Sequence, residues 1–232
     1  MPDLRPVRTV ALIPARNEAD RVADTVSALR PLVDEVVVVD DASADETAAT
    51  ALVAGASVLR ASRRRGKGRA LEEALERLEP ADLWLFADAD LGRTAALLAP
   101  LLETVRNGRA DLAVAVFPEL AGGGFGIVKR VAARAIRAAA RWEPVEPLSG
   151  QRALTAATLA AVRPLAGGFG VETGMTIDAV RAGLKVVEIR IDGLDHRATG
   201  RGPRGFAHRA RQGADILIAV AARLVPRPRR RR

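Results

Sequence analysis

Short runs of β-branched and apolar residues alternate with longer segments of helical periodicity along the first half of this chain of 232 residues. The predicted strands are TVALIP, EVVVVDD, SVLRA, LWLFAD and DLAVAV, and the predicted helices between them cover 18–32, 45–54, 67–78 and 93–105. These strands are almost continuously apolar, which is typical of strands buried on both faces. The sequence therefore predicts an α/β fold with a Rossmann-like, mostly parallel sheet and helices on both faces.

The alternation stops after Phe117. Glycine-rich AGGGFG precedes a predicted helix at 127–141, and the connector WEPVEPLSG leads into QRALTAATLAAV, where no βαβ repeat is recognisable. A second glycine-rich segment, AGGFG, precedes a helix at 171–182, the strand KVVEIRI and a last amphipathic helix at about 204–224. Because neither an internal repeat nor an interdomain linker is visible, we expect a single domain over 1–224.

The composition limits the chemistry that the chain can perform. It has no cysteine, so disulfides and thiolate metal sites are excluded and any metal would be held by oxygen or histidine ligands. A reducing, cytoplasmic location is expected. Arg and Asp interrupt every Ala- and Val-rich stretch, so no run approaches the roughly 18 apolar residues needed to cross a bilayer, and a soluble protein is expected.

The net charge of +8 predicts an anionic partner. Much of the excess lies in the tail VPRPRRRR, residues 225–232, whose prolines and clustered arginines predict disorder. We interpret the tail as solubilising, with a membrane-binding or nucleic-acid-binding arm as the alternative. Aromatic residues make up only 3% of the chain and tyrosine is absent, so the stacking platforms of single-strand nucleic-acid binders are missing and no nucleic-acid partner is expected.

Polar residues follow each of the first three predicted strands, where open α/β sheets bind their ligands. In PARNEAD, Arg16 is placed to hold a diphosphate, and Glu18 either caps the next helix or accepts from a nucleobase. In DDASADET, Asp40 and Asp41 are candidates for ribose hydroxyls or a base edge. In RRRGKGRAL, glycines flank Lys67 at a helix start, which predicts a phosphate cradle that is not a Walker loop. Helix initiation, capping and a solvated turn are the structural alternatives.

The fourth predicted strand carries the sharpest signal. LWLFADADL places Asp88 and Asp90 directly after a buried apolar run, at the carboxyl edge of the sheet. Two neighbouring carboxylates repel each other unless a cation compensates them, and in a cysteine-free chain that binds a diphosphate this cation would be Mg²⁺ or Mn²⁺. Such an ion would stabilise the charge on a departing diphosphate.

Two residues of the second half are further candidates. His196 lies in the loop LDHRATGRG after KVVEIRI, where it is placed to be a third metal ligand or a phosphate contact, or is a surface histidine. Glu172 lies in FGVETGMTIDAV at a predicted helix start. It is a candidate base or acceptor-hydroxyl contact, and the alternative is that it only complements the helix dipole.

The order of these motifs resembles the family 2 glycosyltransferases of the GT-A fold, from about Thr9 to Gln212. The matching segments are PARNE, VVDDAS, GKGRAL, DADL, PLSGQRAL, GFGVETGMTID and KVVEIRI followed by DHR. The resemblance implies a nucleotide-sugar half at about 1–116 and an acceptor half at about 117–224. It implies that the nucleotide sugar is contacted by Pro14, Ala15, Arg16, Glu18, Asp41, Lys67, Asp88 and Ala89. It also implies that Mg²⁺ or Mn²⁺ is bound by Asp90 and His196, with Asp88 as a further ligand.

Two branches of this family are similar to different parts of the chain. Dolichol-phosphate mannosyltransferase-like enzymes share the SGQRA and GFGVE types of segment and imply a lipid-phosphate acceptor. Glucosyl-3-phosphoglycerate synthase-like enzymes share GGGFG, PLSG, GFGVETG and the downstream histidine, and they imply a small phosphorylated acid. The resemblance places acceptor contacts at Gly124, Ser149, Gly150, Gln151 and Arg197. Glu172 would be the catalytic base if the reaction inverts, and would orient the acceptor if it retains.

The expected function is that of a metal-dependent glycosyltransferase that moves a sugar from a nucleotide-diphosphate sugar to a small, phosphorylated or anionic acceptor. A polyprenyl-phosphate glycosyltransferase at the membrane surface and a sugar-phosphate nucleotidyltransferase are the alternatives. The second would need a glycine-rich loop after the first strand, and PARNEAD contains no glycine. A binding module for nucleic acid or membranes would explain the charge but not the ordered acidic strand ends. A homodimer and a peripheral membrane contact through the basic C-terminus are left open.

Overall fold

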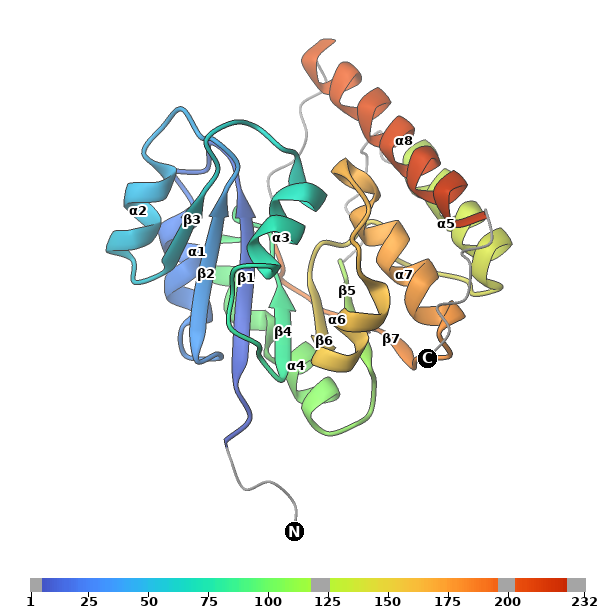
Figure 1. The fold of residues 1–232 in the computed structure, drawn as a ribbon, viewed down its shortest axis with the longest axis horizontal. Coiled ribbons are helices and arrows are strands. Elements are labelled where there is room, and N and C mark those ends of the chain that lie inside the picture. The colour runs from blue at the N-terminus through green and yellow to red at the C-terminus, as the bar shows by residue number, and fades with distance from the viewer. Residues whose placement is uncertain (1–5, 118–125, 196–202, 225–232) are drawn as a thin grey trace.

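The computed structural model describes residues 6–117, 126–195 and 203–224, and it is built around one seven-stranded sheet in the order β3-β2-β1-β4-β6-β5-β7 (Figure 1). The strands are β1 (Thr9–Ala15), β2 (Glu35–Asp40), β3 (Ser57–Arg60), β4 (Leu83–Phe86), β5 (Leu112–Val116), β6 (Arg152–Thr155) and β7 (Val186–Arg190). β1 pairs in parallel with β2 and β4, β2 with β3, and β5 with β7. Only β6 runs antiparallel to its neighbours β4 and β5. The predicted mostly parallel α/β sheet is therefore confirmed.

Helices cover both faces of this sheet (Figure 1). They are α1 (Val22–Leu29), α2 (Thr47–Val53), α3 (Lys67–Leu75), α4 (Ala99–Arg106), α5 (Gly126–Ala140), α6 (Ala156–Val162), α7 (Val171–Arg181) and α8 (Pro203–Leu224), with the 3₁₀ helices η1 (Gly92–Leu98) and η2 (Gly168–Gly170). α1, α2, η1 and α4 share a core with Ile13 and Val38 on one face. α3, α6 and α7 share another with Leu12 and Val37 on the opposite face. Neighbouring strand residues thus point into two cores, which explains why the strands are apolar at almost every position.

β6 joins the two halves of the chain into one domain. It comes from the second half but lies between β4 and β5 of the first half, so both halves share one sheet. α5 and α8 pack together beside α7 in a third core made of Ala132, Ile136, Ile177, Ile216 and Val220. In the described ranges, no helix has the combination of length and apolar character that a bilayer span requires.

Two elements differ from the sequence prediction. The segment RALT forms β6, which was not predicted as a strand, because four residues followed by a helical stretch show no periodicity that separates strand from helix. The helix predicted at 93–105 begins as the 3₁₀ helix η1, and its α-helical part starts only at Ala99. Pro100 accounts for this start, since proline lacks the N–H of an interior helical residue and fits the first turn.

Candidate functional site

Four polar side chains meet at the edge of the sheet where β4 ends. Lys67 Nζ lies 2.6 Å from Asp88 Oδ1 and 2.7 Å from Glu172 Oε1. Gln151 Nε2 donates a hydrogen bond of 3.0 Å to Asp88 Oδ2. We call Lys67, Asp88, Gln151 and Glu172 the lysine cluster. Lys67 is the first residue of α3, Asp88 follows β4, Gln151 precedes β6 and Glu172 lies in α7. The cluster therefore forms only when both halves of the chain are folded together.

The lysine cluster is largely shielded from solvent. The side chains of Lys67 and Glu172 are 21% and 7% exposed, whereas that of Asp88 is 34% exposed and opens the cluster to ligands. Burial by itself would lower the pKa of Lys67, but the charges of Asp88 and Glu172, with their hydrogen bonds, outweigh burial and raise this pKa above its ordinary value. Lys67 is therefore a firmly protonated cation at the site.

Asp41 holds the loop that presents Lys67. Its Oδ1 accepts from Arg65 N at 2.5 Å and its Oδ2 from Gly66 N at 2.8 Å. Gly66 has a φ of +86°, a left-handed conformation that glycine adopts without strain, and α3 begins at the next residue. The predicted role of Asp41 was a ligand contact. The structure gives its carboxylate a second function, which is to fix the backbone directly before Lys67.

The second half supplies Glu172 from the first turn of α7. A carboxylate is favoured there because the backbone N–H groups at a helix start carry a partial positive charge. The side chain nevertheless turns to Lys67 rather than to solvent, so the purely capping interpretation does not describe it completely. Ser149 lies close to Gln151, and its hydroxyl accepts from Gln151 N at 3.4 Å.

Gly150 lets the backbone before β6 approach the lysine cluster. A methyl group on its Cα would lie 2.6 Å from Asp88 Oδ2 and 2.8 Å from Lys67 Nζ, closer than nonbonded atoms allow. Only glycine fits at this position while the ion pair keeps its geometry. The family resemblance places Gly150 among the acceptor contacts, and the structure gives a steric reason for a glycine at this position.

We expect Gly150→Ala to reduce any reaction at this site about tenfold or more, because an added group in a packed position forces its neighbours to move. The measurement is kcat, with the melting temperature recorded in parallel. Gly213→Ala is the matched control, since Gly213 lies within α8 and a methyl group there would meet no atom within 4 Å. If Gly150→Ala keeps the full rate, Asp88 and Lys67 do not act in the geometry described here.

Arg152 lies behind the lysine cluster and was not predicted as a site residue. Only 1% of it is exposed, its Nε donates to Ser149 O at 2.8 Å, and its Nη1 donates to Thr176 Oγ1 at 2.9 Å. Burial lowers the pKa of Arg152 to about 10, against the opposing effect of nearby carboxylates, of which Glu172 is the strongest. The residue stays charged at neutral pH. The sequence feature that could have identified Arg152 as a buried residue was its place as a single arginine in the short segment QRALT.

Arg21 connects Asp90 with the segment that follows β7. Its Nη1 donates to the backbone oxygen of Asp90 at 2.8 Å and lies 3.4 Å from Asp195 Oδ2. His196, the predicted third metal ligand, is the residue after Asp195, the last residue of the described range 126–195. Through Arg21, the structure brings Asp195 close to Asp90. His196 itself lies outside the described residues.

The carboxylates of Asp88 and Asp90 differ in how they could bind a divalent ion. The partly exposed Asp90 offers the hard oxygen that Mg²⁺ and Mn²⁺ prefer, and it fits such an ion. Both carboxylate oxygens of Asp88 have protein partners, and Lys67 balances its charge. The sequence offered only a metal ion as compensation for this carboxylate, and the structure adds a lysine. Within residues 6–117, 126–195 and 203–224, no three His, Cys, Asp or Glu side chains are grouped for ion binding.

A cavity of about 440 Å³ opens at the ends of β2 and β3, lined by Ala42, Ser43, Arg60, Ala61 and Ser62. Asp40 lies beneath it, fully buried, with its Oδ2 3.1 Å from Arg60 Nε and its Oδ1 accepting from Ser43 N. Asn17 N donates to Ser43 Oγ, which ties the loop after β1 to the loop after β2. The cavity is therefore bordered by strand-end loops that were predicted to bind a nucleotide.

The remaining predicted contacts divide into three groups. Pro14, Arg16 and Glu18 lie at the end of β1 and in the loop behind it, with Arg16 exposed and Glu18 N bound to Thr47 Oγ1. Ala15 and Ala89 are in the core, so only their backbone atoms are available to a ligand. The predicted acceptor contacts Gly124 and Arg197 lie outside the described residues.

Comparison with known proteins identifies the relatives of this chain. Residues 10–163 match the family model described as Glycosyl transferase family 2. Glucosyl-3-phosphoglycerate synthase of Mycolicibacterium paratuberculosis is 32% identical over 82% of this chain and 66% of the relative. The same enzyme of Mycolicibacterium smegmatis is 34% identical over 82% of this chain and 71% of the relative. The chain thus spans about two thirds of the length of these curated relatives.

A solved structure has the same fold. Glucosyl-3-phosphoglycerate synthase from Mycobacterium tuberculosis, in complex with Mn²⁺, uridine diphosphate and phosphoglyceric acid, matches with a TM-score of 0.79 at 27% identity. The match covers 96% of this chain and 80% of that one. The family model covers more than half of the chain, and the fold and the order of the motifs agree with it. The chain therefore belongs to glycosyl transferase family 2.

Proposed function

We propose that this protein transfers a sugar from a nucleotide-diphosphate sugar to a hydroxyl group of a small phosphorylated acceptor. The observation that carries the proposal is the lysine cluster, in which Lys67 joins Asp88 of the first half to Glu172 of the second half. A donor bound at the first half and an acceptor bound at the second would meet at this cluster. Such positioning of two substrates is itself a large part of catalysis.

The reaction breaks the bond between the anomeric carbon of the sugar and the diphosphate oxygen, and it forms a bond from that carbon to the acceptor oxygen. The nucleoside diphosphate leaves with the bonding electrons, and the acceptor hydroxyl loses its proton. We assign donor contacts to Lys67 and Asp88, because the exposed part of Asp88 faces the open side of the cluster. We assign the acceptor hydroxyl to Glu172, as its base if the reaction inverts or as its positioning group if it retains.

Asp90 and His196 are the residues proposed to hold Mg²⁺ or Mn²⁺. The proposal is supported by the Arg21 contacts that bring Asp195, the neighbour of His196, to Asp90. A bound divalent ion would neutralise charge on the diphosphate leaving group. Asp88 would bind the ion as well only if it gave up its contact with Lys67 or with Gln151.

The donor is proposed to be a uridine nucleotide, and the acceptor a small phosphorylated acid such as 3-phosphoglycerate. The relatives carry the name glucosyl-3-phosphoglycerate synthase, and the M. tuberculosis structure holds uridine diphosphate and phosphoglyceric acid. The cavity of about 440 Å³ at the ends of β2 and β3 is large enough for a base and ribose. The loop after β1 contacts the loop after β2 through Asn17 N, which donates to Ser43 Oγ, and Glu18 N, which donates to Thr47 Oγ1.

A thermal-shift panel tests the donor and the metal together. We expect one of the UDP-, GDP-, ADP- and TDP-sugars to raise the melting temperature only when Mn²⁺ is present, with the UDP-sugar as the expected one. A ligand at 100 times its Kd stabilises the folded state by about 2.7 kcal/mol, which is on the order of 5–10 °C for a chain of this size. A shift that is equal without metal would contradict the Asp90 assignment.

The acceptor is tested by measuring release of the nucleoside diphosphate with 3-phosphoglycerate and, separately, with a short-chain polyprenyl phosphate. We expect turnover with the phosphorylated acid. Turnover with the polyprenyl phosphate alone would replace the proposed acceptor by the lipid-linked alternative while retaining the donor assignment. Turnover with neither, by a protein that binds the donor, would reject both acceptors.

A further inference from the structure

In the part of α8 whose side chains are described, residues 213–223, one face exposes only apolar side chains. Leu217 and Ile218 are 56% and 67% exposed, and the alanines that share their face are exposed as well. The exposed set is Ala214, Leu217, Ile218, Ala221 and Ala222, with the spacing of one helix face, and we call it the apolar stripe. The opposite face of α8, with Ile216, Ala219 and Val220, is already buried. α8 therefore has a second apolar face that the described residues do not cover.

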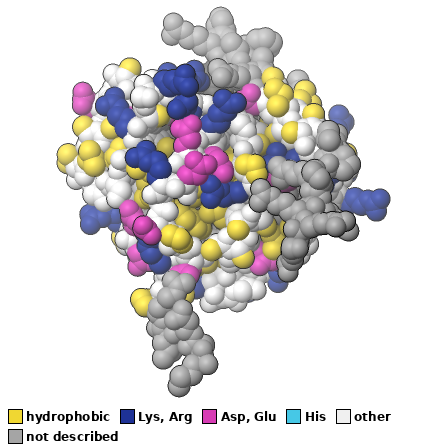
Figure 2. Space-filling model, in the orientation of Figure 1, with side chains coloured by type: hydrophobic (Ala, Val, Ile, Leu, Met, Phe, Trp, Pro, Cys, Tyr) yellow, Lys and Arg dark blue, Asp and Glu magenta, His cyan; other side chains and the backbone are white. Residues whose placement is uncertain are grey.

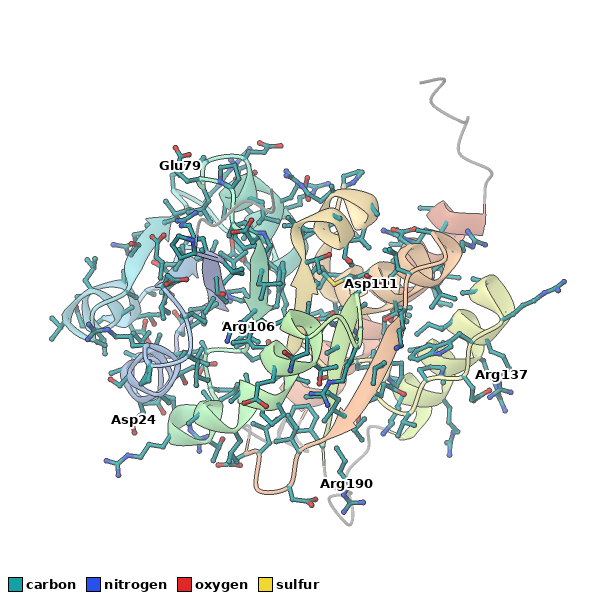
Figure 3. The ribbon with its side chains drawn as sticks, turned by 90° about the horizontal axis from the view of Figure 1, so that it is seen from below. Asp24, Glu79, Arg106, Asp111, Arg137 and Arg190 are labelled. Carbon is teal, nitrogen blue, oxygen red and sulfur yellow. The ribbon has the colours of Figure 1, made fainter. Side chains whose placement is uncertain are left out.

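A row of arginines lies on the neighbouring helix. α5 and the residue after it expose Arg130, Arg134, Arg137 and Arg141, which we call the arginine row. Arg137 pairs with Glu143, whereas the other three form no ion pair with any described residue. Arg137 projects from α5 away from the sheet (Figure 3). The outer face of α5 is thus strongly cationic.

α5 and α8 lie side by side with their C-terminal ends together. Ile136 and Val220 share a buried core, and Arg181 at the end of α7 donates to Ala139 O at 2.8 Å and also to Arg223 O. The apolar stripe and the arginine row are therefore on adjacent helices. Hydrophobic side chains gather at the upper right of the space-filling view, where α8 lies, and Lys or Arg side chains follow along the right-hand rim (Figure 2). In the sequence, α8 leads directly into residues 225–232, which contain five arginines.

We propose that the apolar stripe and the arginine row dock together on an anionic lipid surface. An exposed apolar helix face beside clustered cations matches the interface of an anionic membrane, where apolar side chains enter the acyl boundary and arginines meet the lipid phosphates. A second copy of the chain fits less well. Pairing two apolar stripes would bring two arginine rows to one interface, and their like charges would repel.

The test is cosedimentation with vesicles of phosphatidylglycerol mixed with phosphatidylcholine, compared with vesicles of phosphatidylcholine alone. We expect binding to the anionic vesicles that weakens as salt is added, since surface electrostatics are screened. Leu217→Glu/Ile218→Glu should weaken this binding about tenfold or more, because each glutamate removes an apolar contact and adds repulsion. Arg130→Glu/Arg134→Glu should weaken it at low salt by a similar factor.

The matched control is Leu52→Glu/Val53→Glu on α2, which lies at the opposite side of the molecule from α8 (Figure 1). These residues are 57% and 90% exposed, so the control removes as much exposed apolar surface and should leave vesicle binding unchanged. Equal binding by the stripe variant and the wild type would overturn the proposal. So would a dimer in light scattering that the stripe variant converts to a monomer, if no vesicle binding accompanies it, because the stripe would then be a self-association surface.

Discussion

Lys67→Met is expected to reduce sugar transfer by about 10³-fold, because it removes a cation that contacts both Asp88 and Glu172. Two carboxylates would then face each other across the site without compensation. The same change should lower the free energy of unfolding by about 3 kcal/mol, since breaking a mostly buried ion pair leaves an unbalanced charge behind. Steady-state kcat and urea denaturation measure the two effects.

A double variant separates catalysis from stability. In Lys67→Met/Glu172→Gln the more deeply buried carboxylate is neutral, so we expect stability to recover in part while transfer stays low. Lys129→Met is the matched control, because Lys129 forms an ion pair of 2.8 Å with Glu146 in the second half of the chain, outside the lysine cluster. A Lys67→Met protein that keeps more than a tenth of the wild-type kcat would remove Lys67 from the proposed machinery.

Arg152→Met is expected to cost about 3–5 kcal/mol of stability, the largest effect on folding that we expect from a single substitution. Arg152 is fully buried, and its guanidinium donates to Ser149 O and to Thr176 Oγ1. Methionine fills most of the volume but donates no hydrogen bond and leaves Glu172 and Glu188 without this cation. The melting temperature should fall by about 10 °C for a chain of this size.

The conservative variant shows whether geometry or charge is responsible. Arg152→Lys keeps the charge but loses the fixed fork of donors, so we expect an intermediate loss of stability. Arg93→Met is the control, since Arg93 has a side chain that is 90% exposed and its change should be within experimental error. If Arg152→Met unfolds at the wild-type denaturant concentration, the buried guanidinium does not stabilise the junction between β6 and α7.

The sequence predicted most of the elements and the sheet type, because these depend on local periodicity. Runs such as EVVVVD are apolar at nearly every position since they point into two cores, and this marks a covered parallel strand without any knowledge of its partners. The acidic residues Asp88 and Asp90 were likewise predicted from their place after a buried strand. The motif order also indicated the family, which the comparison confirmed.

The sequence did not predict β6 or the position of Arg152. QRALT has four residues in its strand, too few for a period of two to stand out, and its place between β4 and β5 is set by pairing with segments far away in the chain. Arg152 is buried only because β6 is inserted there, and burial of an arginine is not visible in its neighbours along the sequence.

What the sequence determined by itself was the alternation of strands and helices, the candidate side chains at the strand ends and the family. What only the tertiary structure decided was which of these side chains meet. Lys67, Asp88 and Glu172 are separated by up to 105 positions, and Nζ–O distances of 2.6 and 2.7 Å between them arise from the strand order and from the packing of α3 and α7 on the same face. Periodicity is a local property, whereas the compensation of buried charge depends on three-dimensional neighbours, which is why the pairing of Lys67 with Asp88 and Glu172 is visible only in the tertiary structure.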